Sequence, residues 1–131
     1  TTYDMFASTF PNVGDDNPVA VKLNQATKYV VTSTSGKLTW QNSHQISGDI
    51  TAEVAQLKKQ DGPLLQVHGS WQLVQTLLAN ELVDEFRLWT FPVVVGSGKR
   101  LFGNGNPQCS FSLVKTEATP SGVVMTIYRR I

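Results

Sequence analysis

The stretch from residue 64 to residue 82 limits what this chain can fold into more than any other part of the sequence. Residues 64–68, Leu-Leu-Gln-Val-His, form a short and mostly apolar run, which is typical of an inner strand of a sheet covered on both faces. Gly69 and Ser70 follow, and the next twelve residues carry an apolar stripe at helical spacing, made of Val74, Leu77, Leu78 and Leu82. A buried strand that turns directly into an amphipathic helix predicts an α/β fold.

The other segments extend this pattern. Residues 1–7 and 50–59 are predicted as helices, the second with Asp49 as N-cap, whereas residues 19–24 are ambiguous. Strands are predicted at residues 28–32 and 85–95, the latter bent or interrupted at Pro92, and residues 40–43 form a loop or short strand. Two alternating segments, 111–117 and 123–129, predict a terminal antiparallel hairpin. We therefore expect one domain over residues 1–131, with a mostly parallel mixed sheet that has helices on both faces and ends in this hairpin.

Composition excludes several classes of protein. Lys and Arg total 11 against 10 Asp and Glu, so the sequence has no electrostatic footprint for nucleic acid or an acidic membrane. The single cysteine, Cys109, cannot form an internal disulfide or a thiolate metal site. No membrane-length apolar run and no secretory signal pattern is found, and we expect a cytoplasmic protein.

The turn at Gly69 and Ser70 is the strongest candidate for a binding site. A helix N-terminus offers unpaired backbone N–H groups and the positive end of the helix dipole, which together favour a phosphate. Gly69 would let a ligand approach the backbone closely, and the Ser70 hydroxyl could donate to a phosphate oxygen. Because one Gly-Ser pair falls short of a dinucleotide fingerprint, the simpler alternative stays open, in which Gly69 makes a tight turn and Ser70 only caps the helix.

A second polar turn, at residues 32–37, follows the earlier strand. Its hydroxyl groups and its lysine could hold a further phosphate, such as the 2′-phosphate of NADP. The alternative is an ordinary polar loop, since Ser and Thr are common in turns.

The remaining candidates are weaker. His68 is more simply a strand-end histidine, and His44 has no nearby partner of a metal-ligand type, so no metal site is predicted. Residues 96–98, Gly-Ser-Gly, could contact a ligand or form a turn, and Cys109 lacks any sign of a lowered pKa.

Taken together, the segments resemble the dihydrofolate reductase-like superfamily, in the branch that includes the C-terminal reductase domain of the riboflavin-pathway bifunctional deaminase-reductase. The order and spacing of six segments carry the resemblance: residues 2–4, 28–34, 40–43, 67–70, 82–85 and 91–102.

This resemblance implies a three-layer αβα fold and NADPH-dependent reduction of a pyrimidine- or pterin-like small molecule. It also implies a set of cofactor-binding residues. These are Thr1 and Thr2 near the phosphates, Ser33 and Thr34 by the adenosine ribose and its 2′-phosphate, and Gly69, Ser70, Gln72 and Leu73 around the pyrophosphate.

The resemblance is incomplete at the N-terminus. Members of the family begin with a strand that carries a Ser-Leu-Asp-Gly-like segment and helps to form the substrate and nicotinamide site, and residues 1–131 hold no counterpart. We interpret the chain as a truncated or incompletely represented member, and expect it to expose unpaired backbone groups and apolar surface. No acid or base stands out, so we assign no catalytic residue.

Two functions stay open at this point. One is the reductase, and the other is a cofactor- or partner-binding module that has lost the substrate site. The oligomeric state is open as well, with a homodimer as one alternative, because family members commonly associate and apolar surface near Trp89 and Phe91 could take part.

Overall fold

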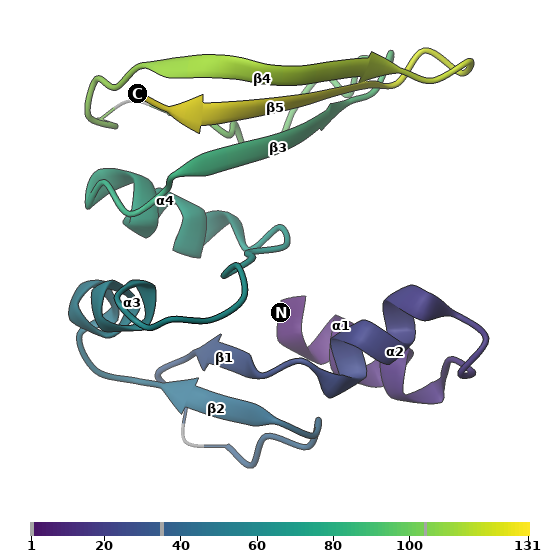
Figure 1. Ribbon diagram of the computed structural model, residues 1–131, viewed down its shortest axis with the longest axis vertical. Helices are drawn as coiled ribbons and strands as arrows, with labels where there is room; N and C mark the ends of the chain where they lie inside the picture. Colours follow the sequence, from purple (N-terminus) through teal and green to yellow (C-terminus); the bar gives the residue numbers. More distant parts are fainter. Residues whose placement is uncertain (1, 35, 104) are drawn as a thin grey trace. The chain divides into compact units, whose positions relative to one another are not determined.

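A computed structural model describes residues 2–34, 36–103 and 105–131 of the chain. It is a mixed α/β structure that divides into two compact units, Thr1–Leu73 and Val74–Ile131 (Figure 1). One unit holds a parallel pair of strands and the other an antiparallel sheet of three strands. The prediction of one domain over residues 1–131 stays a prediction.

The helices of the first unit are α1 (Thr2–Thr9), the 3₁₀-helix η1 (Phe10–Asn12), α2 (Pro18–Gln25) and α3 (Ile50–Lys58). Two of them, α2 and α3, begin at side-chain caps. The Asp49 carboxylate accepts from the backbone N–H of Ala52 at 3.1 Å, which confirms the predicted N-cap. Asn17 caps α2 in the same way, because its side-chain oxygen accepts from two backbone N–H groups at 3.0 and 3.1 Å. The ambiguous residues 19–24 are therefore helical.

The parallel strands of this unit are β1 (Lys28–Val31) and β2 (Ser43–Ile46), paired from Lys28 opposite Ser43 to Val31 opposite Ile46. The strand predicted at residues 28–32 is confirmed. β2 begins at the end of the segment that we described as a loop or short strand, and its polar sequence Ser-His-Gln-Ile explains why it was not recognised.

Trp40 forms the centre of the apolar packing in this unit. It is buried, and its ring stacks on Phe10 with centroids 6.2 Å apart. The backbone N–H of Trp40 donates to the Tyr3 hydroxyl at 2.9 Å, and its indole N–H donates to Asn24 Oδ1 at 2.8 Å. The Lys28 ammonium lies 4.3 Å from the ring centroid. These contacts join α1, η1 and α2 to the start of the strand pair.

The strand predicted at residues 64–68 is wrong. This segment belongs to no strand, and Leu64, Leu65 and Val67 are exposed. A strand is defined by hydrogen bonds to a neighbour, and within the described residues the ladders of this unit join only β1 and β2. Apolar composition alone therefore does not make residues 64–68 a strand here.

The second unit contains most of α4 (Trp71–Ala79), then β3 (Glu85–Thr90), β4 (Phe111–Ala118) and β5 (Val124–Arg130). Its sheet has the order β3-β5-β4 and is antiparallel throughout, which confirms the predicted terminal hairpin. β3 ends at Thr90, earlier than predicted. Pro92 explains this end, because proline has no N–H to donate to a ladder.

The core of the second unit is small and aromatic. Leu77, Leu78 and Phe86 are buried. The Phe86 ring meets Phe102 edge-on at 5.4 Å and Phe111 at 5.3 Å. Since side chains alternate along a strand, Phe86 and Trp89 lie on opposite faces of the sheet.

Candidate functional site

The chain enters α4 through two successive residues in the left-handed region. Gly69 has φ +60° and Ser70 has φ +50°. Glycine adopts this conformation without the steric cost that other residues pay. Apart from its two chain neighbours, no atom lies within 4 Å of the position that a Cβ on Gly69 would occupy, so the space above this residue is open. The backbone of the turn thus favours glycine at position 69, and the open space leaves room for a ligand.

Ser70 differs from the two helix N-caps of the chain. Asn17 and Asp49 have the extended backbone usual at an N-cap, with φ −95° and −71°, whereas Ser70 is left-handed. The Ser70 hydroxyl donates to the backbone carbonyl of His68 at 3.3 Å. Ser70 therefore lacks the extended backbone usual at an N-cap, and the capping alternative is not tested by these contacts.

The first turn of α4 carries Gln72 and Leu73, which the resemblance also places at the cofactor. No acidic residue stands in this turn, unlike α3, which has Glu53 in its first turn. The positive end of the α4 dipole is therefore not offset by a carboxylate of its own first turn.

The second polar turn follows β1 and is held from β2. The amide of Gln45 donates to the carbonyl oxygens of Thr32 and Thr34 at 3.1 and 3.3 Å, and Thr34 N–H donates to the Thr32 hydroxyl at 3.2 Å. Ser33 and Thr34 themselves are exposed. No sequence signal points to Gln45, because a neutral amide on a short strand carries no motif.

The remaining predicted cofactor residues are at the start of the chain. Thr2 begins α1, and Thr1 lies outside the described residues. Thr2, Ser33, Thr34, Gly69, Ser70, Gln72 and Leu73 all belong to the same compact unit. Their contact with a cofactor stays a prediction.

The two histidines are in aromatic surroundings. The His68 ring lies 6.2 Å from Phe6 and the His44 ring 5.9 Å from Tyr29, both tilted. Among the described residues, no three His, Cys, Asp or Glu side chains come together as a metal site would require.

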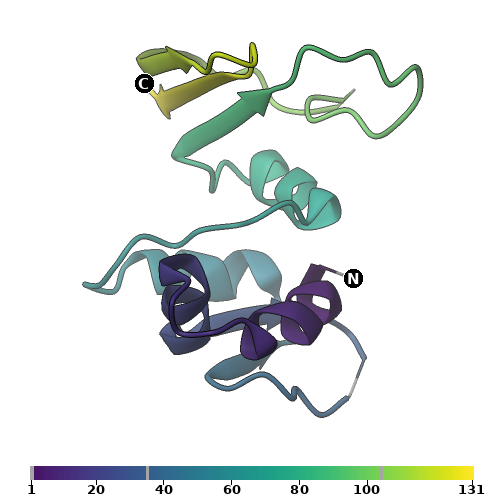
Figure 2. The same cartoon turned by 90° about the vertical axis from the view of Figure 1, so that its right-hand side faces the viewer.

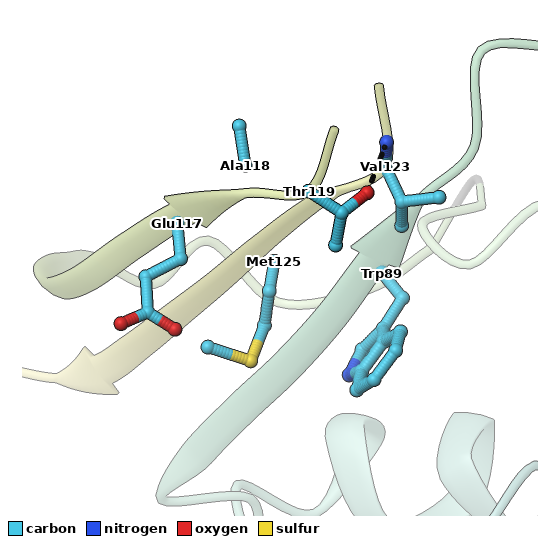
Figure 3. Close-up of a pocket in the computed structure, with 6 residues that line it drawn as sticks. All are labelled: Trp89, Glu117, Ala118, Thr119, Val123 and Met125. Atoms are coloured by element: carbon cyan, nitrogen blue, oxygen red, sulfur yellow. Dashed lines mark hydrogen bonds between the residues drawn. The ribbon is translucent and has the colours of Figure 1, made fainter. Parts of the chain in front are cut away.

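The antiparallel sheet carries a separate hollow of about 410 Å³. Trp89, Met125 and Glu117 stand in register across β3, β5 and β4, and their side chains lie along one face (Figure 3). The full lining is Trp89, Glu117, Ala118, Thr119, Val123 and Met125. The lining holds one carboxylate and no basic group, so it does not offer a site for a cofactor phosphate.

Comparison with known proteins decides the family. The sequence pattern described as "RibD C-terminal domain" matches residues 8–125. The chain belongs to the RibD C-terminal domain family. This confirms the resemblance found in the sequence.

Two relatives give the extent of the likeness. "Uncharacterized protein YyaP" of Bacillus subtilis (strain 168) is 38% identical over 101 residues, which are 77% of this chain and 53% of YyaP. A "Putative riboflavin biosynthesis protein" from Shewanella sp. PV-4 has a crystal structure that matches with a TM-score of 0.76 at 24% identity, over 99% of this chain and 70% of that one. The structural match confirms the predicted dihydrofolate reductase-like fold, and the matched part of this chain spans about half the length of YyaP.

The α-helices of this RibD-type domain are short. Within the described residues, none reaches the length and apolar character needed to cross a membrane.

Proposed function

We propose that this RibD-type domain is an NADPH-dependent reductase that acts on a pyrimidine- or pterin-like small molecule. Membership of the RibD C-terminal domain family implies a reductase-like role in riboflavin biosynthesis. The observation that carries the finer proposal is the turn at Gly69 and Ser70, which is left-handed, open above Gly69 and directly followed by α4.

The chemistry of this turn fits a pyrophosphate. Backbone N–H groups at the start of α4 can donate to its oxygens, and the helix dipole favours its negative charge. The first turn of α4 contributes no acidic side chain that would repel it. Gly69, Ser70, Gln72 and Leu73 would bind this part of the cofactor.

The exposed turn after β1 fits the adenosine end. Ser33 and Thr34 present hydroxyl groups to solvent, while Gln45 fixes the backbone beneath them. Hydroxyls that can donate to a 2′-phosphate would distinguish NADPH from NADH.

The bound cofactor would supply a hydride for an electron-poor carbon of the substrate. The residues of this chain contribute binding and orientation, which can account for much of the rate by holding the reactants in place. We assign no general acid or base among the residues of this chain.

The second candidate is a binding module without reductase chemistry. The exposed apolar residues Leu64, Leu65 and Val67 are the observation that favours it, because a segment without strand partners offers no formed substrate site.

One experiment separates the two functions. NADPH is titrated into the full-length protein, and nicotinamide absorbance is then followed after a candidate pyrimidine or pterin is added. Saturable binding with a substrate-dependent fall in absorbance supports the reductase. Binding without turnover of any candidate contradicts it in favour of the module, and no binding contradicts both.

The turn after β1 has a test of its own. We expect Ser33→Ala with Thr34→Ala to weaken NADPH at least about a hundredfold, since each lost charge-assisted hydrogen bond costs about 1.5–3 kcal/mol when fully formed. NADH, which lacks the 2′-phosphate, is the control ligand and should bind the double variant as it binds the native chain. An equal loss for both cofactors would contradict the assignment.

A further inference from the structure

The segment between β3 and β4 has no role in the proposed function. Figure 2 shows it extending away from the strands of its own sheet. Its first part, residues 93–100, is named here the basic arm. Val93, Val94 and Val95 are 68%, 98% and 79% exposed, so the arm is not held by apolar packing.

The backbone of the arm is shaped by glycine. Gly96 has φ +75° and Gly98 has φ +150°. Ser97 N–H donates to the carbonyl of Val95 at 2.9 Å, which closes a tight turn between them. Apart from the chain neighbours of each glycine, no atom lies within 4 Å of a Cβ built on either one, so a ligand can reach the main chain here.

The charge of the arm has one sign. Lys99 and Arg100 are adjacent, and the sequence holds no Asp or Glu between Glu85 and Glu117. A cluster of positive charge attracts anions, and the planar guanidinium of arginine matches a phosphate with two parallel hydrogen bonds.

The base of the arm is fixed by a side chain of α4. Gln75 Nε2 donates to the carbonyl of Leu101 at 2.9 Å, and Gln75 Oε1 accepts from Asn106 Nδ2 at 3.4 Å. Phe102, the next residue, packs edge-on against the buried Phe86. Lys99 and Arg100 therefore precede an anchored point, so binding costs less conformational entropy than in a loop that is free at both ends.

We propose that the basic arm binds a phosphoryl group of a small molecule through Lys99, Arg100 and the glycine backbone, and that Gln75 is the residue that positions it. The residues of the arm belong to the second unit, whereas the turns at Ser33 and Gly69 belong to the first. The phosphoryl group belongs either to the nicotinamide cofactor or to a second small molecule.

The first test uses inorganic phosphate as the probe. Backbone amide signals of the intact chain are followed by ¹H–¹⁵N NMR during titration with phosphate, with sodium chloride at matched ionic strength as the reference. We expect saturable shifts at residues 96–100, and a loss of affinity of about tenfold or more in the double variant K99Q/R100Q. The double variant K58Q/K59Q removes an adjacent pair of charges from the end of α3 and should bind phosphate as the native chain does.

The second test examines the positioning residue. Gln75→Leu removes both hydrogen bonds, and Gln75→Glu keeps the acceptor for Asn106 while losing the donor to Leu101. Each should speed amide exchange at residues 97–103 and weaken phosphate several-fold. If the leucine variant fails to fold, Gln75→Glu alone provides the test. A folded variant with faster amide exchange but unchanged phosphate affinity would overturn the positioning role of Gln75.

The affinity of K99Q/R100Q for NADPH distinguishes the two sources of the phosphoryl group, the cofactor and a second small molecule. A parallel loss of NADPH binding in K99Q/R100Q assigns the arm to the cofactor, whereas unchanged NADPH binding with lost phosphate binding assigns it to a second molecule. Shifts that do not saturate, or phosphate affinity equal in the native chain and K99Q/R100Q, would overturn the proposal. Because phosphate alone is the probe, this result is independent of whether the domain is a reductase.

Discussion

Glu85 joins two strands through a pair of arginines. Its carboxylate accepts from Arg87 Nε at 2.7 Å within β3 and from the Arg129 guanidinium of β5 at 3.0 Å. The hydrogen bond from Arg87, followed by those from Arg129, lowers the pKa of the Glu85 carboxyl below its ordinary value. A carboxyl whose pKa is lower in the folded state stabilises the fold above its unfolded pKa, and this contribution is lost as the pH falls through the folded value.

This linkage predicts the effect of Glu85→Gln. The native chain should lose thermal stability as the pH falls below about 4.5, and the variant should start lower at neutral pH and show a shallower acid decline. Thermal midpoints measured between pH 7 and pH 3 check this. Asp61→Asn, in an exposed loop, is the matched control and should follow the native curve. An acid decline in Glu85→Gln as steep as the native one would contradict the role of the two arginines.

Single residues differ in how well their sequence context predicts them. Asp49 was predicted as an N-cap because it stands directly before an apolar periodic stretch, and the structure agrees. Asn17 was not, because Asn-Pro is also a common turn signal. Gln45 and Gln75 hold the two polar segments by their amides, yet no spacing rule marks a glutamine that bonds a distant carbonyl.

At the scale of elements, the amide exchange rates of residues 64–68 test most clearly whether this segment is unpaired, as it is in the structure. Strand amides exchange slowly because they are hydrogen-bonded, whereas exposed extended backbone exchanges fast. We therefore expect the amides of residues 64–68 to exchange far faster than those of β5, which is paired on both sides. Hydrogen–deuterium exchange with peptide resolution measures both in one sample. Protection of residues 64–68 equal to that of β5 would contradict the unpaired state.

Most elements with local causes were predictable, although residues 19–24 of α2 were ambiguous, whereas strands that depend on a partner were predicted unevenly. The predicted helices and the terminal hairpin follow from caps, periodicity and a short turn, all of which lie within about twenty residues of sequence. Residues 64–68 have the composition of a strand, but pairing requires a neighbour, and composition does not supply one. β3 was predicted too long because residues 93–95 are as apolar as a strand, although Pro92 interrupts the ladder.

At the scale of the whole molecule, the exposed apolar surface around Trp89 leads us to expect self-association of the chain. Trp89 and Phe91 remain 61% and 57% exposed, and Trp89 shares a face with Met125. Large exposed apolar patches commonly mark interaction sites.

We expect the chain to self-associate through this face. The substitution Trp89→Ser should raise the dissociation constant of the self-associated form about tenfold, as loss of a central aromatic contact does at other interfaces. Light scattering across a concentration series measures this, and a native chain that stays monomeric at every concentration would contradict the expectation.

The family and fold of the molecule were accessible from the sequence because the order and spacing of several segments carry them. The division into two units was not, since it depends on which segments pair. The predicted cofactor residues that the structure describes fall in one unit, and the positive φ of Gly69 gives a reason why glycine is favoured at that position.

The dissociation constant for NADPH tests the cofactor turn most directly. Quenching of tryptophan emission during titration reports binding, and Trp71, the exposed residue after Ser70, is one of the three tryptophans of the chain. Gly69→Val should cost about 1–2 kcal/mol of stability, because a β-branched residue is strained at positive φ, and should weaken NADPH at least a hundredfold by closing the space above the turn. Gly122→Val carries the same kind of strain at φ +85° in the turn between β4 and β5 and should leave NADPH affinity unchanged. A native chain that does not bind NADPH, or a folded Gly69→Val that binds it as the native chain does, would contradict the account.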